Sequence, residues 1–142
     1  MAYDQHWVGS EEAGSVAEIP WVDESIQRNL KEVPKEKLVL GIPFYTRIWE
    51  ESDAGLKSLA YGMKPTQNML DKWGITPVFD SFSGQNYAEV EKNDSVYKVW
   101  IEDRLSIAQR IELVNRYQLA GYGAWKLGLE TPDIWEELAK VK

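Results

Sequence analysis

Aromatic side chains are the chemically most informative feature of this sequence. Its 142 residues include seven tryptophans and seven tyrosines. Indole and phenol rings stack on the C–H faces of sugars while their polar groups form hydrogen bonds, so this composition indicates a carbohydrate site. A tryptophan-rich hydrophobic core explains the same composition, and composition alone leaves both interpretations open.

Carboxylates, by contrast, form no obvious catalytic pair in the sequence. Acids do occur as adjacent residues, at Glu50-Glu51, Glu102-Asp103 and Glu136-Glu137. Neighbouring side chains point apart on both helices and strands, so these pairs do not share a site. We expect them on solvated faces and at helix ends. We expect a second group on amphipathic elements to be core residues: Trp73, Trp100 and Trp135.

Metal and polyanion chemistry is disfavoured by composition. The chain has no cysteine and a single histidine, His6, so it lacks thiolate ligands and cannot build a histidine-rich metal site. Its formal net charge of −7 disfavours nucleic acid and anionic membrane surfaces as partners. The first residues lack the basic and apolar regions of a signal peptide, and no apolar run is long enough to span a membrane.

The elements that must position these groups begin as a strand–helix–strand unit. Residues 1–4 resemble the end of a strand, and Pro20 opens a helix that ends before Pro34. Residues 37–44 form a continuous apolar run, typical of a strand buried on both faces of a parallel sheet. Ligands bind at the carboxyl ends of such strands, where Tyr45 follows.

The pattern changes between residues 50 and 101. A helix is predicted from Lys64 to about Trp73, closed by Gly74. Short strands are predicted at 76–80, 85–91 and 95–101, the last two alternating like antiparallel partners. This region is therefore predicted to be a small α+β insertion.

Strand and helix alternation then resumes. Asp103 is the predicted N-cap of a helix over 104–117, residues 119–125 form a strand, and Thr131 and Pro132 start a last helix that reaches about Lys140. The fold class is thus α/β, with three parallel strands and an insertion. The chain is too short for a complete (β/α)₈ barrel, which takes about 250 residues.

Three motifs, in order, resemble glycoside hydrolase family 18. "MAYD" at residues 1–4 resembles the motif that ends its sixth barrel strand, and "KLVLGIPFYTRIW" at 37–49 resembles its seventh strand. "LAGYGAWKLGLE" at 119–130 resembles its eighth strand. The insertion lies in the expected gap, so the resemblance covers essentially the whole chain. It is nearest in character to the bacterial spore and cell-wall branch.

This resemblance implies a partial TIM barrel, made of its last three strands and helices. Residues 1–49 would hold strands six and seven with the intervening helix, and 50–101 the chitinase-type insertion. Residues 102–142 would hold helix seven, strand eight and helix eight. The family's catalytic signature, D-x-x-D-x-D-x-E on strand four, matches nothing in these residues. The partners implied are an N-acetylated glycan and the missing N-terminal half of the barrel.

The resemblance also implies roles for individual residues. Tyr3 matches a tyrosine that holds the acetamido oxygen of the substrate, with Asp4 in a supporting catalytic role. Trp125 matches the tryptophan floor of the sugar subsite at the cleavage point, and its small neighbours leave room for a flat ligand. The other expected substrate-binding residues are Gln5, Trp7, Tyr45 and Arg47.

One departure from the family pattern affects these expectations. Thr46 stands where the family usually has glycine, which puts the loop around Arg47 in doubt. His6 is expected to be a bystander. No residue is expected to bind a metal, because the family uses no cofactor.

The implied function is hydrolysis of β-1,4-linked N-acetylglucosamine glycans, either chitin or peptidoglycan, outside the cell, in the cell wall or on the spore. The family is a substrate-assisted exception to two-carboxylate catalysis: the substrate's own acetamido group attacks, with retention. Without its general acid, this chain alone is expected to be inactive. A lectin-like sugar-binding module and an inactive assembly fragment are the alternatives. Unpaired strand edges also predict a homo-oligomer.

Overall fold

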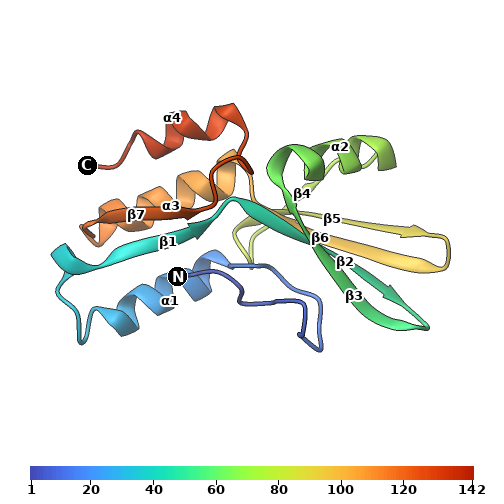
Figure 1. The fold of residues 1–142 in the computed structure, drawn as a ribbon, viewed down its shortest axis with the longest axis horizontal. Helices are drawn as coiled ribbons and strands as arrows, with labels where there is room; N and C mark the ends of the chain where they lie inside the picture. The colour runs from blue at the N-terminus through green and yellow to red at the C-terminus, as the bar shows by residue number, and fades with distance from the viewer.

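A computed structural model describes residues 1–142 and divides the strands between two sheets (Figure 1). The strands are β1 Val39–Pro43, β2 Tyr45–Ser52, β3 Gly55–Gly62, β4 Val78–Asp80, β5 Gln85–Lys92, β6 Ser95–Ile101 and β7 Gly121–Trp125. The helices are α1 Ile19–Asn29, α2 Met63–Trp73, α3 Arg104–Arg116 and α4 Trp135–Leu138, with 3₁₀ turns η1 Lys35–Lys37 and η2 Pro132–Ile134.

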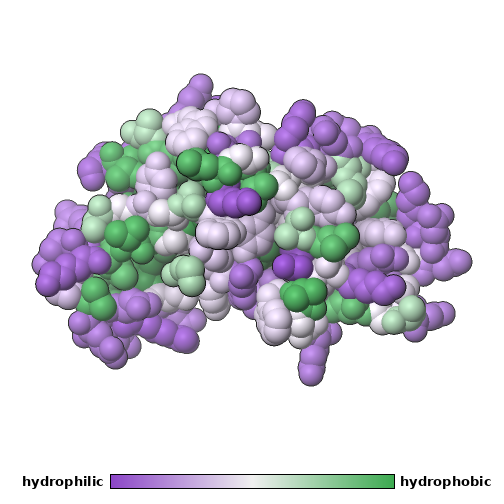
Figure 2. Space-filling view, in the orientation of Figure 1, coloured by the Kyte–Doolittle hydropathy of each residue, from purple (hydrophilic) through white to green (hydrophobic).

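The first sheet is the parallel pair β1–β7. Leu40 and Ile42 are buried among apolar residues of α1 and α3, which form the larger of two hydrophobic clusters. The opposite face carries Val39, which is exposed, and mostly glycines. Figure 2 shows apolar residues gathered over β1 on the side that faces the viewer. One face of this pair is therefore covered by helices and the other is open.

The predicted first strand is corrected by the structure. Residues 1–4 run beside β1, but a single backbone hydrogen bond, from Ala2 N to Gly41 O at 3.1 Å, joins them to it. Asp4 has a φ of 59°, which takes the chain out of the extended region before a ladder can form. The close approach requires glycine, since a Cβ on Gly41 would lie 2.8 Å from Met1 Cα. The parallel sheet accordingly has two strands rather than three.

The second sheet is antiparallel, with strand order β3-β2-β6-β5-β4. The helix α2 and the strands β4, β5 and β6 were predicted, whereas the β2–β3 hairpin was not. This sheet begins at Tyr45, ahead of residue 50. Its own apolar cluster includes Ile48, Leu70 and Val99, where α2 packs on the sheet. Asn93 and Asp94 both have positive φ and make the tight turn between β5 and β6.

The helix ends follow their local sequence. Asp103 caps α3 as predicted, accepting hydrogen bonds from Leu105 N at 2.9 Å and Ser106 N at 3.1 Å. The α1 helix stops at Asn29, short of the predicted end before Pro34. The last predicted helix is shorter too, consisting of η2 followed by one turn at α4. No helix is both long and apolar enough to cross a membrane.

Three burial predictions were wrong. Glu102 and Glu137 are buried although they were expected on solvated faces, and each has a cationic partner, Arg110 and Arg104 respectively. Trp135 was expected in the core but is 46% exposed at the start of the single-turn helix α4, whose buried residues are Glu137 and Leu138. Whether an acid in such an adjacent pair is buried therefore depends on the tertiary structure around it and not on its position in the sequence.

Candidate active site

Tyr3, Asp4 and Tyr45 form one cluster at the carboxyl end of β1. The Tyr45 hydroxyl donates a hydrogen bond to Asp4 Oδ1. The Tyr3 and Tyr45 rings meet edge to face, with centroids 6.2 Å apart and an interplanar angle of 78°. Tyr45 is buried, Tyr3 half-buried and Asp4 exposed. The structure therefore brings together three of the residues chosen from the sequence, with the carboxylate on the solvent side.

Burial raises the pKa of the Tyr45 phenol well above its usual range, and the hydrogen bond to Asp4 adds to this effect. A phenolate beside a carboxylate would place two negative charges in contact, so the neutral phenol is the stable form. Tyr45 thus remains a hydrogen-bond donor throughout the neutral range and holds Asp4 in one orientation.

Trp125 ends β7 beside this cluster. Its carbonyl accepts a hydrogen bond from Phe44 N at 2.8 Å, which fixes the end of β7 next to the start of β2. The side chain itself is 57% exposed. Gly123, two residues earlier on the same face of β7, has no side chain beside the indole. An exposed indole is a flat platform on which the apolar face of a sugar can stack.

Arg47 lies one pleat beyond Tyr45, on the same face of β2. Its Nη1 donates to Ser58 Oγ of β3 at 3.1 Å, which orients the guanidinium, and its Nε is buried without a partner. Thr46, which replaces the usual glycine, is buried on the other side, where its Oγ1 accepts a hydrogen bond from Glu102 N at 2.8 Å. The threonine thus ties β2 to the end of β6.

Gln5 holds the N-terminal loop closed, because both polar atoms of its side-chain amide bond Glu18. Its side-chain amide donates to Glu18 Oε2 at 2.9 Å and accepts from Glu18 N at 2.8 Å, which closes the loop between residues 5 and 18. The His6 ring likewise bonds Ser15 O at 2.8 Å. Trp7 is 54% exposed, and its ring lies over Gly9. In this loop, Trp7 alone offers a free aromatic surface to a ligand.

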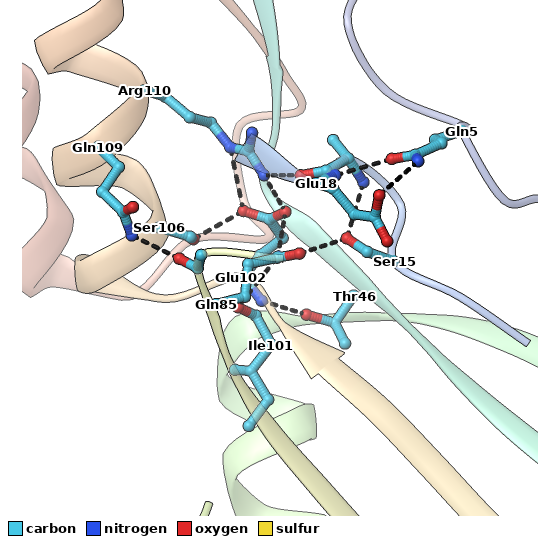
Figure 3. Close-up of polar contacts among 12 residues, drawn as sticks. Gln5, Ser15, Glu18, Thr46, Gln85, Ile101, Glu102, Ser106, Gln109 and Arg110 are labelled. Carbon is cyan, nitrogen blue, oxygen red and sulfur yellow. Dashed lines mark hydrogen bonds and ion pairs between the residues drawn. The ribbon is translucent and has the colours of Figure 1, made fainter. Parts of the chain in front are cut away.

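A buried polar network joins the antiparallel sheet to α3 and to the N-terminal loop (Figure 3). Glu102 and Arg110 form a fully buried ion pair at its centre. Glu102 also accepts from Gln85 Nε2 at 2.9 Å and from Ser106 Oγ at 2.7 Å. Arg110 Nη2 donates to Ala17 O at 2.7 Å. The network therefore links the N-terminal loop, β5, the end of β6 and α3.

Burial raises the pKa of Glu102, while the Arg110 guanidinium opposes this shift. This ion pair was not predicted, although the sequence contains an indication of it. Arg110 lies on the apolar face of α3 that Ile107, Ile111 and Val114 define, and a cation on such a face requires a buried acceptor. The pair holds β2 and α3 in place around the site, and it does not contact the open face beside Trp125.

The cluster can hold a ligand by hydrogen bonding and stacking. No group of three or more histidine, aspartate or glutamate side chains gathers as a metal site. The carboxylate at the cluster is Asp4, which already accepts a hydrogen bond from the Tyr45 hydroxyl. The arrangement therefore offers polar groups that orient a sugar and an indole that supports it.

Comparison with known proteins relates this chain to glycan hydrolases. The pattern that defines glycosyl hydrolases family 18 matches residues 1–130. The chain is 29% identical to an uncharacterized glycosylase, YvbX, of Bacillus subtilis, over 99% of this chain and 40% of the relative. It is 24% identical to a cortical fragment-lytic enzyme of Bacillus anthracis, over 99% of this chain and 33% of the relative. The chain thus spans well under two thirds of these relatives.

Solved structures agree in fold. A chitinase from Chromobacterium violaceum superimposes with a TM-score of 0.88 at 27% identity, over 99% of this chain and 43% of that one. The Bacillus cereus spore cortex-lytic enzyme SleL superimposes with a TM-score of 0.87 at 23% identity, over 98% of this chain and 33% of that one. The mixed α/β arrangement of both sheets is therefore shared with chitinases.

Proposed function

Because the chain belongs to glycosyl hydrolases family 18, we propose that it is the C-terminal part of a hydrolase of β-1,4-linked N-acetylglucosamine glycans. One observation carries the proposal: Tyr3, Asp4, Tyr45 and Trp125 gather at the carboxyl ends of parallel chain segments. Ligand sites of α/β folds lie at that end. Relatives that are cortical fragment-lytic enzymes and a class V chitinase support a wall, spore or chitin glycan.

In this proposal the cluster positions the sugar at the cleavage point. The indole of Trp125 stacks under the ring, and the phenol of Tyr3 donates to the acetamido oxygen as that group attacks the anomeric carbon. Asp4, held by Tyr45, orients the same centre. Arg47 and Trp7 contact neighbouring sugars, and Gln5 shapes the loop that carries Trp7. The reaction retains configuration and needs no cofactor.

The proposal assigns the general acid to a different part of the barrel. The family's D-x-x-D-x-D-x-E signature has no match in this sequence. Residues 1–49 and 102–142 would complete a (β/α)₈ barrel with an N-terminal half, and residues 50–101 would form one wall of its cleft. The chain alone then lacks the acid that contributes about 10²–10⁴-fold in rate, together with half the binding cleft.

An assay with a fluorogenic chitobioside and with soluble peptidoglycan tests this assignment. The chain alone should release product at the background rate, and addition of the N-terminal half of a family relative should restore turnover. Tyr3→Phe should reduce that restored rate. Turnover by the chain alone that is lost in Asp4→Asn would contradict the assignment, because the catalytic acid would then lie within these residues.

A non-catalytic sugar-binding module is the second candidate, favoured by the exposed indole of Trp125, which offers a surface for stacking without any catalytic group. Titration with chitotetraose tests the binding that both candidates require. Trp125→Ala should weaken it by about tenfold, since one stacked ring contributes about 1–1.5 kcal/mol. Unchanged affinity would make Trp125 a surface residue without a role in sugar binding. Restored turnover in the complementation assay separates the enzyme from the binding module.

Self-association is a further part of the proposal. Met1 and Val39 are exposed at the open edge and face of the parallel pair, where another sheet or a second copy can cover them. Sedimentation velocity at high micromolar concentration should detect a dimer or larger species. A stable monomer at that concentration would favour a barrel completed by the N-terminal half instead.

A further inference from the structure

A second hollow, far along the insertion sheet, has its own chemistry. It is a groove of about 730 Å³ between the C-terminal half of α2, the strands β2 and β3, the β5–β6 turn, and Val8 of the N-terminal loop. Figure 1 shows the β5–β6 hairpin extending beyond the end of α2, so the helix leaves the outer part of the sheet uncovered. Ile48 and Glu50 line the groove, and they alternate along β2 with Arg47 of the site already described. The groove therefore opens mainly on the opposite face of the sheet.

The floor and wall of the groove are aromatic. Tyr61, Trp73 and Tyr97 line it, and the Trp73 and Tyr97 rings pack with centroids 5.3 Å apart. All three are half-buried, so each ring retains an accessible part. Leu59 adds an aliphatic side chain that is 65% exposed. Flat, partly exposed rings beside aliphatic surface suit the C–H face of a sugar better than they suit a peptide with charged side chains.

The charge at this groove is opposite to that of the chain as a whole. Lys57, Lys72 and Lys92 line it and are exposed, although the chain carries a net charge of −7. None of the three takes part in an ion pair or a side-chain hydrogen bond, while Lys98 nearby is paired with Glu51 at 2.7 Å. The one carboxylate that lines the groove, Glu50, accepts a hydrogen bond from Ser95 Oγ at 3.0 Å. Three ammonium groups are thus free to bind anions.

The other large hollow provides an internal contrast. A hollow of about 630 Å³ between α2 and η2 is lined by Asp71, Asp103 and Asp133, with Lys64 as its one cation. It would repel the same ligand that the lysine-rimmed groove attracts. Positive charge is therefore concentrated at the groove that also carries the aromatic rings.

We propose that this lysine-rimmed aromatic groove is a second glycan-binding site, for N-acetylated glycan strands whose sugars carry carboxylate groups. Sugar rings stack on Tyr61, Trp73 and Tyr97, and the lysines pair with the carboxylates. The choice of a glycan rests on the proposed function, whereas the preference for carboxylates rests on the lysines. Such a site holds an anionic polymer mainly on the α2 face of the insertion sheet, and Val8 of the N-terminal loop lies at its rim.

Nuclear magnetic resonance titration distinguishes the two sites, because Trp73 and Trp125 each provide an indole N–H signal, assigned with Trp73→Phe and Trp125→Ala. The probe is a tetrasaccharide of alternating N-acetylglucosamine and N-acetylmuramic acid, compared with neutral chitotetraose. The Trp73 signal should report binding about tenfold tighter for the carboxylated probe, an advantage that salt reduces. Binding reported by Trp73 should persist in Trp125→Ala. Loss of binding at the groove can therefore be distinguished from failure of the proposed cleavage site.

Matched charge variants decide the role of the lysines. The triple variant Lys57→Gln, Lys72→Gln, Lys92→Gln should bind the carboxylated probe about tenfold more weakly at Trp73. The control Lys31→Gln, Lys37→Gln, Lys142→Gln removes the same charge from exposed positions elsewhere and should bind as the parent does. Equal responses to both probes, unchanged affinity in the groove variant, or equally tight binding of an oligoglutamate peptide would each overturn the proposal.

Discussion

The two sheets of this molecule are stabilised in different ways. The parallel pair β1–β7 joins segments from distant parts of the chain, and helices cover one of its faces. The five-stranded sheet is antiparallel, its neighbouring strands are linked largely by short turns, and it has its own apolar cluster under α2. Antiparallel hairpins form from local contacts, whereas a parallel pair needs a long crossover connection. The insertion is therefore the more self-contained region, and the parallel pair depends on what packs around it.

The buried Glu102–Arg110 pair is where the two regions depend on each other. It lies at the end of β6 and on α3, and it also reaches the N-terminal loop through Ala17 O. Functional groups lie on both sides of this junction, with Tyr45 and Arg47 on the first strand of the insertion sheet and Trp125 on the parallel pair. The geometry of the candidate site thus depends on the contact between a self-contained region and a dependent one.

The largest expected effect comes from breaking that junction. Glu102→Ala leaves the Arg110 guanidinium buried without its counter-ion, and this should lower the free energy of unfolding by about 3–5 kcal/mol. Urea denaturation measures the change. Glu24→Ala is the control, because it removes an exposed ion pair with Arg28 at 2.5 Å and should cost less than about 1 kcal/mol. Equal small losses in both variants would mean that the junction carries little stability.

A matched pair of core truncations tests whether the two regions unfold separately. Ile42→Ala in the larger cluster and Ile48→Ala in the insertion cluster should each cost about 2–5 kcal/mol. Hydrogen exchange should accelerate mainly at β1 and β7 in Ile42→Ala, and mainly at β2 and β6 in Ile48→Ala. The same acceleration throughout the chain in both variants would show one cooperative unit instead.

The smallest expected effect concerns Tyr45 and alkaline pH. Its folded-state pKa is raised by burial and by Asp4, so the stability that its neutral form contributes is complete below the unfolded pKa of about 10 and is lost as the pH rises further. Tyr45→Phe removes the hydrogen bond to Asp4 and should cost about 1 kcal/mol at neutral pH.

Thermal unfolding between pH 8 and pH 11 measures the alkaline effect. The parent should lose more stability above pH 10 than Tyr45→Phe does, because the variant has no phenol at this position to ionise. Parallel curves for the two proteins would contradict the link between Tyr45 ionisation and stability.

Much of the architecture could be predicted because its signals are local. The apolar run that became β1, the N-cap Asp103 and the Gly74 end of α2 each act through neighbouring residues. The β2–β3 hairpin could not be predicted in the same way. Its first strand alternates between a buried site face and the α2 face, and both faces are covered only in the folded chain.

The residues of the candidate site were also identified from the sequence, whereas their contacts and exposure came from the structure. The resemblance to family 18 marked Tyr3, Asp4, Tyr45, Arg47 and Trp125 as candidate glycan-binding residues. Tertiary structure decided that Tyr45 holds Asp4, that the Gln5 amide is occupied by Glu18, and that Trp125 is exposed.

The burial of Glu102 could not be predicted from its own neighbours in the sequence, although Arg110 on the apolar face of α3 indicates that some buried acceptor exists. Glu102 and Asp103 are adjacent and chemically similar, yet Glu102 is a buried ion-pair partner and Asp103 a half-buried helix cap. The sequence by itself determined the helix cap, because capping requires only the next three residues. Only the tertiary structure decided that Glu102 is buried. A buried carboxylate is stable only where hydrogen-bond donors from distant parts of the chain, here Gln85 and Arg110, converge on it.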